Sequence, residues 1–281
     1  MPEWQAARLV AAHDETATAR TLVFDVPGWP GHLAGQHVDI RVTAPDGYSA
    51  SREYSIASGE VAAAAPLPGA PDAAGSAPGS VSGSAPGSVS GDSSPLTGAP
   101  PGANVEFSIE ELADGEVSPY LVRGLEIGDH LEIRGPVGGY FVWKATQPEP
   151  VQLIAGGSGV VPLMSMLRTH AAAGHPTPMK LLYSVRGPQF AFYTDELRRI
   201  ADTSMGAASV DYAFTRSAPE GSDRSVGRLM REELEMLALP VSSSPTIYLC
   251  GPNSFVEGIS QWLLELGHPA SRILTERFGG A

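Results

Sequence analysis

One stretch of the sequence decides how the second half of the chain folds: Ala155-Gly156-Gly157-Ser158-Gly159-Val160-Val161-Pro162. It follows the apolar run 151–155, which has the length of a buried strand, and it precedes a helical pattern over 160–172. Glycines between a strand and a helix predict a tight βα turn whose backbone can approach a phosphate closely. The stretch does not match Gly-x-Gly-x-x-Gly, because position 162 is proline.

The alternation of strands and helices continues to the end of the chain. Further strand-like runs lie at 180–185, 209–214, 246–250 and 272–276. Helical patterns lie near 193–201, 228–237 and 253–266. This order predicts a parallel sheet covered by helices on both faces, with ligands at the carboxyl ends of its strands.

The first half of the chain has a different pattern, in which short strands of alternating apolar and polar residues are separated by Gly and Pro. The predicted strands lie at 6–12, 20–26, 38–43, 52–57, 105–112 and 130–134. A short helix is expected at 119–123, with Ser118 as its N-cap and Pro119 at its first position. The pattern is typical of a small antiparallel barrel.

Residues 59–104 interrupt the barrel pattern with Ala, Gly, Ser and Pro. An eight-residue unit, Gly-Ser-Ala-Pro-Gly-Ser-Val-Ser, occurs at 75–82 and again at 83–90. Such a composition buries too little apolar surface to offset the entropy of ordering its backbone. We expect a disordered insertion within a first domain of residues 1–147, followed by a second domain of residues 148–281.

Composition excludes several classes of protein. The formal net charge of −13 and the lack of a Lys or Arg run argue against a nucleic-acid partner. A single cysteine, Cys250, excludes a disulfide framework and a multi-cysteine metal site, so no metal is expected and a reducing compartment is favoured. No signal peptide and no run of about 18 apolar residues is found. The sequence therefore predicts a soluble, cytoplasmic protein without a membrane partner.

Four short segments follow one another in a characteristic order along the chain. They are Gly35-Gln36-His37-Val38, then Arg52-Glu53-Tyr54-Ser55-Ile56-Ala57-Ser58, then Gly115-Glu116-Val117-Ser118, and then Gly135-Pro136-Val137-Gly138-Gly139-Tyr140-Phe141. With the glycine turn, the Cys-Gly-Pro at 250–252 and the Glu-x-aromatic element at 276–278, this order resembles the ferredoxin NADP reductase family. The resemblance covers the chain except the 59–104 insertion. It implies a six-stranded Greek-key β-barrel that binds flavin and a Rossmann-like parallel sheet that binds NAD(P).

The resemblance implies a role for each matching residue. On the flavin side, Arg52 is expected to bind phosphate, Tyr54 to pack on the isoalloxazine, and Ser55 to lie near its N5 atom. The pyrophosphate would be held by Gly115, Val117 and Ser118, and Phe278 would stack on the ring. Three further residues, Gly279-Gly280-Ala281, follow Phe278, which departs from the family pattern. Ser55, Cys250 and Glu276 would surround the point of hydride transfer, where Cys250 would line the pocket and not act as a nucleophile.

The remaining implied contacts are with the nicotinamide nucleotide. They involve Gly156, Gly157, Ser158, Gly159, Cys250, Gly251 and Pro252. Arginines at strand ends also suit a ribose 2′-phosphate, and the candidates are Arg186, Arg216 beside Thr215, and Arg228 at the start of a predicted helix. They favour NADPH over NADH. FAD is the flavin that the family implies, with FMN as the alternative because residues 110–113 offer no aromatic hairpin for an adenine.

The expected function is a flavin-dependent NAD(P)H oxidoreductase that passes hydride to FAD and electrons to a separate acceptor. A ferredoxin-type carrier is the first expectation for that acceptor, since one cysteine cannot hold an iron–sulfur cluster. Three alternatives remain open. They are an NAD(P)H:flavin or small-molecule reductase, a flavin-bearing electron-transfer subunit of a larger oxidoreductase, and an interaction protein that recruits partners through its low-complexity loop.

Overall fold

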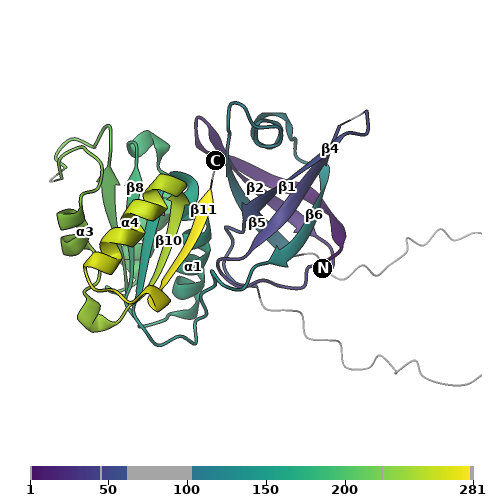
Figure 1. Ribbon diagram of the computed structural model, residues 1–281. Coiled ribbons are helices and arrows are strands. Elements are labelled where there is room, and N and C mark those ends of the chain that lie inside the picture. Colours follow the sequence, from purple (N-terminus) through teal and green to yellow (C-terminus); the bar gives the residue numbers. More distant parts are fainter. Residues whose placement is uncertain (1, 45, 62–102, 223, 279–281) are drawn as a thin grey trace, which may run out of the picture.

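The computed structural model describes residues 2–44, 46–61, 103–222 and 224–278. Figure 1 shows two bodies side by side, an antiparallel barrel and a parallel sheet with helices on both faces. The predicted two-part fold is therefore confirmed. Most of the predicted insertion, residues 62–102, lies outside the described residues. Of the insertion's margins, Val61 pairs with His32 and Ala103 begins a strand.

The first body is a six-stranded antiparallel sheet with the strand order β4-β3-β6-β1-β2-β5. Its strands are β1 (Trp4–Thr16), β2 (Ala19–Val26), β3 (His37–Thr43), β4 (Ser49–Ser55), β5 (Ala103–Glu110) and β6 (His130–Val137). The chain just after β4 reaches the opposite edge strand, where the Ala57 amide donates to the Glu106 carbonyl over 2.8 Å. This contact brings the two edges of the sheet together.

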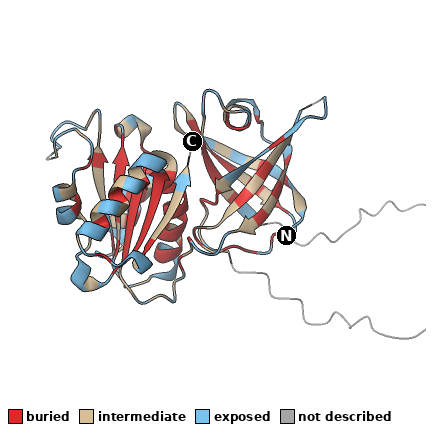
Figure 2. Ribbon diagram, viewed as in Figure 1, coloured by how far each residue is buried: buried red, intermediate tan, exposed pale blue. Residues whose placement is uncertain are grey.

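The barrel interior is filled by alternate residues of its strands, as period-two patterning requires. Along β2, Leu22, Phe24 and Val26 are fully buried, and the Phe24 and Phe107 rings lie 6.0 Å apart between centroids. Figure 2 shows the buried residues alternating with exposed ones along the strands.

The second body is a five-stranded parallel sheet in the order β11-β10-β7-β8-β9. Its strands are β7 (Val151–Gly156), β8 (Met179–Val185), β9 (Ala208–Phe214), β10 (Thr246–Pro252) and β11 (Ile273–Phe278). Its helices are α1 (Val160–Ala173), α2 (Thr194–Thr203), α3 (Arg231–Leu237) and α4 (Asn253–Glu265). Neighbouring residues of β7 face opposite ways, because Leu153 packs with α1 whereas Ile154 packs with α3 and α4.

Two local expectations are wrong. The helix expected from Arg228 begins only at Arg231, because Met230 is extended, so Arg228 lies in the loop before it. Ser118 makes no side-chain cap for the turn Tyr120–Gly124. Its hydroxyl instead accepts a hydrogen bond from the Leu112 amide over 3.0 Å.

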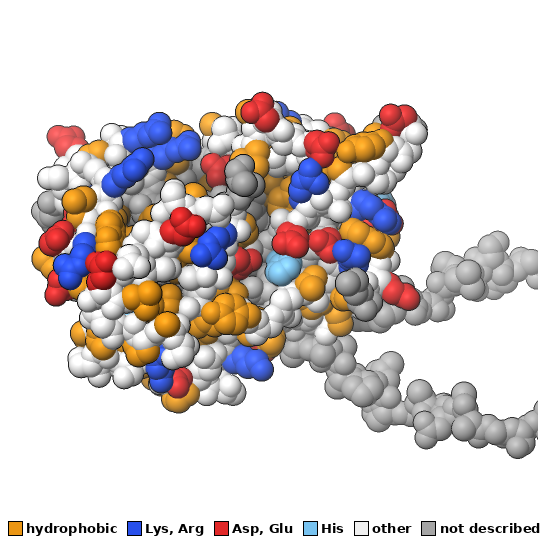
Figure 3. Space-filling view, in the orientation of Figure 1, with side chains coloured by type: hydrophobic (Ala, Val, Ile, Leu, Met, Phe, Trp, Pro, Cys, Tyr) orange, Lys and Arg blue, Asp and Glu red, His pale blue; other side chains and the backbone are white. Residues whose placement is uncertain are grey.

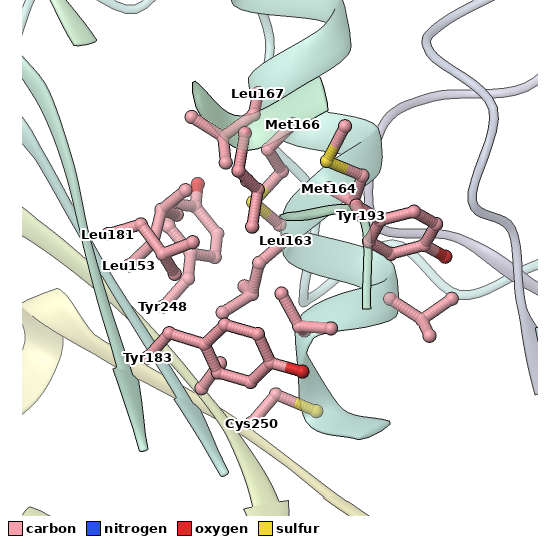
Figure 4. Packing of buried hydrophobic residues seen from close by; sticks show 14 of the residues in the cluster. Leu153, Leu163, Met164, Met166, Leu167, Leu181, Tyr183, Tyr193, Tyr248 and Cys250 are labelled. Carbon is pink, nitrogen blue, oxygen red and sulfur yellow. The ribbon is translucent and has the colours of Figure 1, made fainter. Parts of the chain in front are cut away.

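Helix α1 lies between the two bodies and is buried for most of its length. One apolar cluster joins α1 and the parallel sheet to Ala57, Phe141 and Trp143 of the first half of the chain. Figure 4 shows the α1 side chains Leu163, Met164, Met166 and Leu167 packed within this cluster. The Phe141 and Tyr248 rings meet edge to face, and the Tyr248 hydroxyl donates to the Val142 carbonyl over 2.8 Å. The interface between the bodies therefore has the character of a core.

No helix among the described residues is long and apolar enough to cross a membrane.

Leu163→Ala should lower the free energy of unfolding by about 2–5 kcal/mol, because the fully buried side chain leaves a cavity. Chemical denaturation measures the change. Leu264→Ala on α4 is the matched control, since that leucine is 44% exposed and its loss should cost less than about 0.5 kcal/mol. Equal losses in the two variants would contradict the described packing of α1.

Candidate active site between the two domains

A cavity of about 240 Å³ lies where the barrel meets the last strand of the parallel sheet. The barrel contributes His37 from β3 and Glu53, Tyr54 and Ser55 from β4. The parallel sheet contributes the end of β11, residues 276–278. The structure thus brings the predicted residues Tyr54, Ser55, Glu276 and Phe278 together, although they lie more than two hundred residues apart in the sequence.

Ser55 is a buried polar residue without a hydrogen-bond partner in the part of the chain that the structure describes, as is typical of a residue that binds a ligand. It is 5% exposed, and its hydroxyl is buried without a hydrogen-bond partner among the described residues. A buried polar group without a partner is costly, so such a group in a native fold calls for an explanation. Next to it, burial raises the pKa of Tyr54 to about 12, which keeps that phenol protonated and neutral. A planar ligand with hydrogen-bonding edges, such as a flavin, fits this pair.

Glu276 and Cys250 lie side by side on neighbouring strands, since β10 and β11 pair these two residues directly. Burial, assisted by the charge of Glu53, raises the pKa of Glu276 to about 7, and one of its carboxylate oxygens has no partner among the described residues. Burial and the charge of Glu276 raise the pKa of the Cys250 thiol, which is completely buried. The thiol stays protonated, so Cys250 is not poised as a nucleophile.

The glycine turn packs at Gly156 and Gly159 against the end of β10 and the start of α4, with no room for a side chain at either position. A Cβ atom on Gly159 would lie 2.3 Å from the Cys250 carbonyl oxygen, and one on Gly156 would lie 2.7 Å from the Phe255 ring. Gly157 has a φ of +57° and borders open space. The turn and the end of β10, residues 250–252, therefore lie together at the carboxyl ends of β7 and β10. Ser158 and Gly159 lie in the turn that leads into α1.

The predicted phosphate residues of the barrel also meet. Arg52 donates to the Glu116 carboxylate over 2.6 Å, and both side chains are about half exposed. Glu116 stands inside the 115–118 segment, where Val117 is buried and a Cβ on Gly115 would press on the Ser118 hydroxyl at 2.8 Å. The Arg52 guanidinium and this turn are thus in direct contact on the surface of the barrel.

The arginines of the second domain lie at the carboxyl ends of β8 and β9. Backbone hydrogen bonds hold the two ends together, with Thr215 donating to Val185 and Arg216 to Arg186. The side chains of Arg186, Arg216 and Arg228 are exposed and form no ion pair within the part of the chain that the structure describes. Figure 3 shows Lys and Arg side chains gathered at this end of the domain.

Comparisons with known proteins agree with the fold. Residues 153–261 match the family model of the oxidoreductase NAD-binding domain. The chain is 30% identical over 188 residues to the reductase component of propane 2-monooxygenase from Rhodococcus jostii, which covers 65% of this chain and 49% of that protein. The flavohem-like FAD/NAD-binding domain of nitric oxide dioxygenase from Vibrio cholerae superposes with a TM-score of 0.75 at 21% identity, covering 98% of this chain and 99% of that one.

A ferredoxin NADP+ reductase from Neisseria gonorrhoeae, solved with FAD and NADP, superposes with a TM-score of 0.71 at 17% identity over 99% of both chains. The chain therefore has the two-domain fold of these solved structures, and residues 153–261 match an oxidoreductase NAD-binding domain. The chain spans about half the length of the curated relatives it matches. The roles of its individual residues stay predictions.

Sequence reasoning missed several residues, among them Glu53, His37 and Arg168. Glu53 belongs to the Arg-Glu-Tyr-Ser segment, but the sequence indicated no role for it. It lines the cavity, and its charge raises the pKa of Glu276. His37 lines the same cavity from the neighbouring strand, and only the period-two pattern of β3 could have indicated this. Arg168 looked like one more polar residue of a helix, yet its side chain is only 17% exposed at the domain interface.

Glu276→Gln should remove a pH-dependent part of the stability of the protein. The folded protein keeps a proton on Glu276 up to about pH 7, whereas the unfolded chain releases it near 4.5. The stability that protonated Glu276 provides is thus fully present below about pH 4.5 and is lost as the pH rises through about 7. The free energy of unfolding should fall by up to about 3 kcal/mol over this range. Urea denaturation at about pH 5 and about pH 8 measures it.

Glu257→Gln, at an exposed position of α4, is the control for this pH dependence. It should leave the difference between the two pH values as in the unaltered chain. If Glu276→Gln also left that difference unchanged, the buried protonated carboxyl would be ruled out.

Proposed function

We propose that the chain is an NAD(P)H-dependent FAD oxidoreductase that passes electrons to a separate acceptor. The observation that supports this most directly is the cavity in which the unpartnered Ser55 hydroxyl and the Glu276 carboxyl meet from two domains. One domain offers Arg52 and Tyr54 to a flavin, and the other offers a glycine turn to a dinucleotide. The matched family model and the reductase-component relative point to the same activity.

The residues of the chain have defined tasks in this proposal. Bound FAD would supply the hydride acceptor, while Arg52 and the 115–118 turn hold its phosphates and Tyr54 packs on its ring. The Ser55 hydroxyl donates a hydrogen bond to an acceptor atom of the flavin ring. This bond is strong because the hydroxyl is buried away from water. Gly156, Gly157 and Gly159 let the pyrophosphate of the coenzyme approach the protein backbone closely. Cys250, Gly251 and Pro252 line the site and exclude water from the point of hydride transfer.

The acceptor is proposed to be a separate protein, with a ferredoxin-type carrier as the first candidate. A relative's name describes a reductase component, which is a protein that works with other components. These 281 residues contain a single cysteine, fewer than an iron–sulfur cluster needs as ligands. Direct reduction of a free flavin or small molecule is the second candidate. A cytoplasmic location stays a prediction.

NADPH is the proposed coenzyme in preference to NADH. Arg186, Arg216 and Arg228 lie exposed at one end of the parallel sheet, where the adenosine half of a dinucleotide binds in such sheets. A guanidinium binds a phosphate with two parallel hydrogen bonds, so these side chains suit a ribose 2′-phosphate.

The proposed function predicts that the pure protein is yellow, or becomes yellow when reconstituted with FAD. Anaerobic addition of NADPH or NADH should bleach the flavin absorbance, because the coenzyme reduces it. Flavin identification after denaturation distinguishes FAD from FMN. A protein that binds no flavin even after reconstitution contradicts the proposal and favours the interaction-protein alternative.

Within the same experiment, Ser55→Ala should slow flavin reduction in stopped flow by about tenfold to a thousandfold, which is roughly 1.4–4 kcal/mol of barrier. Ser260→Ala is the matched control, because Ser260 on α4 also has a buried hydroxyl without a partner among the described residues. An unchanged rate in Ser55→Ala would remove that hydroxyl from the mechanism.

Arg216→Ala should raise the KM for NADPH by about tenfold to a hundredfold and leave the KM for NADH unchanged, since only NADPH has the 2′-phosphate. Steady-state reduction of a dye acceptor with each coenzyme measures both values. Arg8→Ala on β1 removes the same charge from an exposed position of the barrel and should alter neither. Equal effects on both coenzymes would contradict the assignment of Arg216.

A further inference from the structure

The segment that follows Ser55 is hydrogen-bonded to helix α1 at three successive points. The Ala57 carbonyl accepts from Arg168 over 3.0 Å, and the Ser58 carbonyl accepts from the Ser165 hydroxyl over 2.6 Å. The Glu60 amide donates to the Thr169 hydroxyl over 2.7 Å. Each partner on α1 is a polar residue of a helix that is otherwise packed in an apolar core.

Arg168 is the charged centre of this contact. Its guanidinium donates to Glu106 of β5 over 2.5 Å and grips Glu196 of α2 with two bonds of 3.0 and 2.7 Å. It lies over the Tyr193 ring at 5.3 Å. The two carboxylates belong to different domains, so Arg168 joins the barrel to the parallel sheet. The Arg168 side chain is only 17% exposed, so these ion pairs are partly buried. Salt screens partly buried charges less than charges at the surface.

Tyr193 strengthens the same joint from the other side. Its amide donates to Glu15 of β1 over 2.8 Å, and its hydroxyl bonds to the Ser108 hydroxyl of β5. Tyr193 adopts a φ of 58°, a left-handed conformation that a bulky residue rarely takes. Such a conformation persists where surrounding contacts impose it. The loop before α2 is thus fixed against the barrel around Arg168.

The joint connects two segments that matter for the proposed function. Residues 57–60 continue directly from β4, which ends in Ser55, and α1 continues directly from the glycine turn 156–159. We propose that Arg168 is a positioning residue: by holding the Ala57 carbonyl and the Glu106 carboxylate on α1, it fixes where the coenzyme ring lies relative to the flavin. This inference rests on the proposed function. Reaction rates are sensitive to such alignment, because a misplacement of about 1 Å can cost about a hundredfold.

The first test needs no flavin. In Arg168→Met, amide hydrogen exchange of residues 56–61 should become faster, because the segment loses the bond from Arg168 to the Ala57 carbonyl. Arg168→Lys keeps one charged donor and should restore part of the protection. The control is Glu132→Gln, which breaks a 2.5 Å ion pair with Arg41 that lies wholly within the barrel. It should leave the exchange of residues 56–61 unchanged.

The second test measures flavin reduction by saturating NADPH and NADH in stopped flow. Glu106→Gln removes the interdomain ion pair but keeps the backbone bonds of residue 106 to residues 57 and 58. Glu106→Gln and Arg168→Met should lower the limiting rate by about tenfold to a hundredfold, with flavin content and coenzyme Kd unchanged. Glu132→Gln should retain the full rate. This separation of rate from affinity is not expected of a residue that only stabilises the fold.

The outcomes separate the two proposals. Unaltered exchange of residues 56–61 in Arg168→Met would overturn the clamp, whether or not the protein binds flavin. Full limiting rates in Arg168→Met and Glu106→Gln, or an equal loss in Glu132→Gln, would overturn the positioning role. An unaltered protein that takes up no flavin would instead overturn the proposed function, while the exchange data would still decide whether the clamp exists.

Discussion

The architecture depends on one constraint, which is the burial of helix α1 on both sides. Most surface helices bury one face and expose the other to water. Here one face of α1 packs on the parallel sheet and the opposite face packs on the barrel, so residues such as Leu163 and Met166 are both fully buried. Three polar side chains of α1, those of Ser165, Arg168 and Thr169, therefore form hydrogen bonds with the first domain. Two domains joined in this way share a core and form one unit.

Close backbone contacts at the cavity follow from the same tight arrangement. Glycine stands at 156 and 159 because the end of β10 and the Phe255 ring of α4 occupy the space that a side chain would need. The cavity between the barrel and β11 is lined by Ser55 and Glu276, each of which has a buried polar atom without a partner among the described residues. A fold tolerates such groups when a ligand satisfies them, and the arrangement is consistent with a site built for a flavin and a nicotinamide ring.

The sequence predicted the order and type of the elements well, because their hydrophobic periods are clear. The strand expected at 180–185 is Met179–Val185, and the helix expected at 253–266 is Asn253–Glu265. The errors arose where tertiary contacts override local preference. Ser118 looked like an N-cap, but its hydroxyl is engaged by Leu112. Arg228 looked like a helix start, but α3 begins with Arg231 after the extended Met230.

The candidate site was predictable only as far as its residues belonged to a recognisable pattern. Tyr54, Ser55, Glu276 and Phe278 were named in advance and lie around one cavity. Glu53 and His37 were not, since their role comes from the meeting of two strands with β11. Arg168 was equally hidden, because its partners at 106 and 196 lie far away in sequence and no local signal connects them.

The complete burial of Cys250 has a practical consequence. It is the only cysteine of the chain, and its side chain is fully buried near the carboxyl end of β10, where its carbonyl oxygen lies against Gly159. A thiol reagent can reach it only when the packing around this end of β10 opens. The rate of thiol modification therefore reports directly on opening of the nucleotide-binding half, with no engineered label and no background from other sulfhydryl groups.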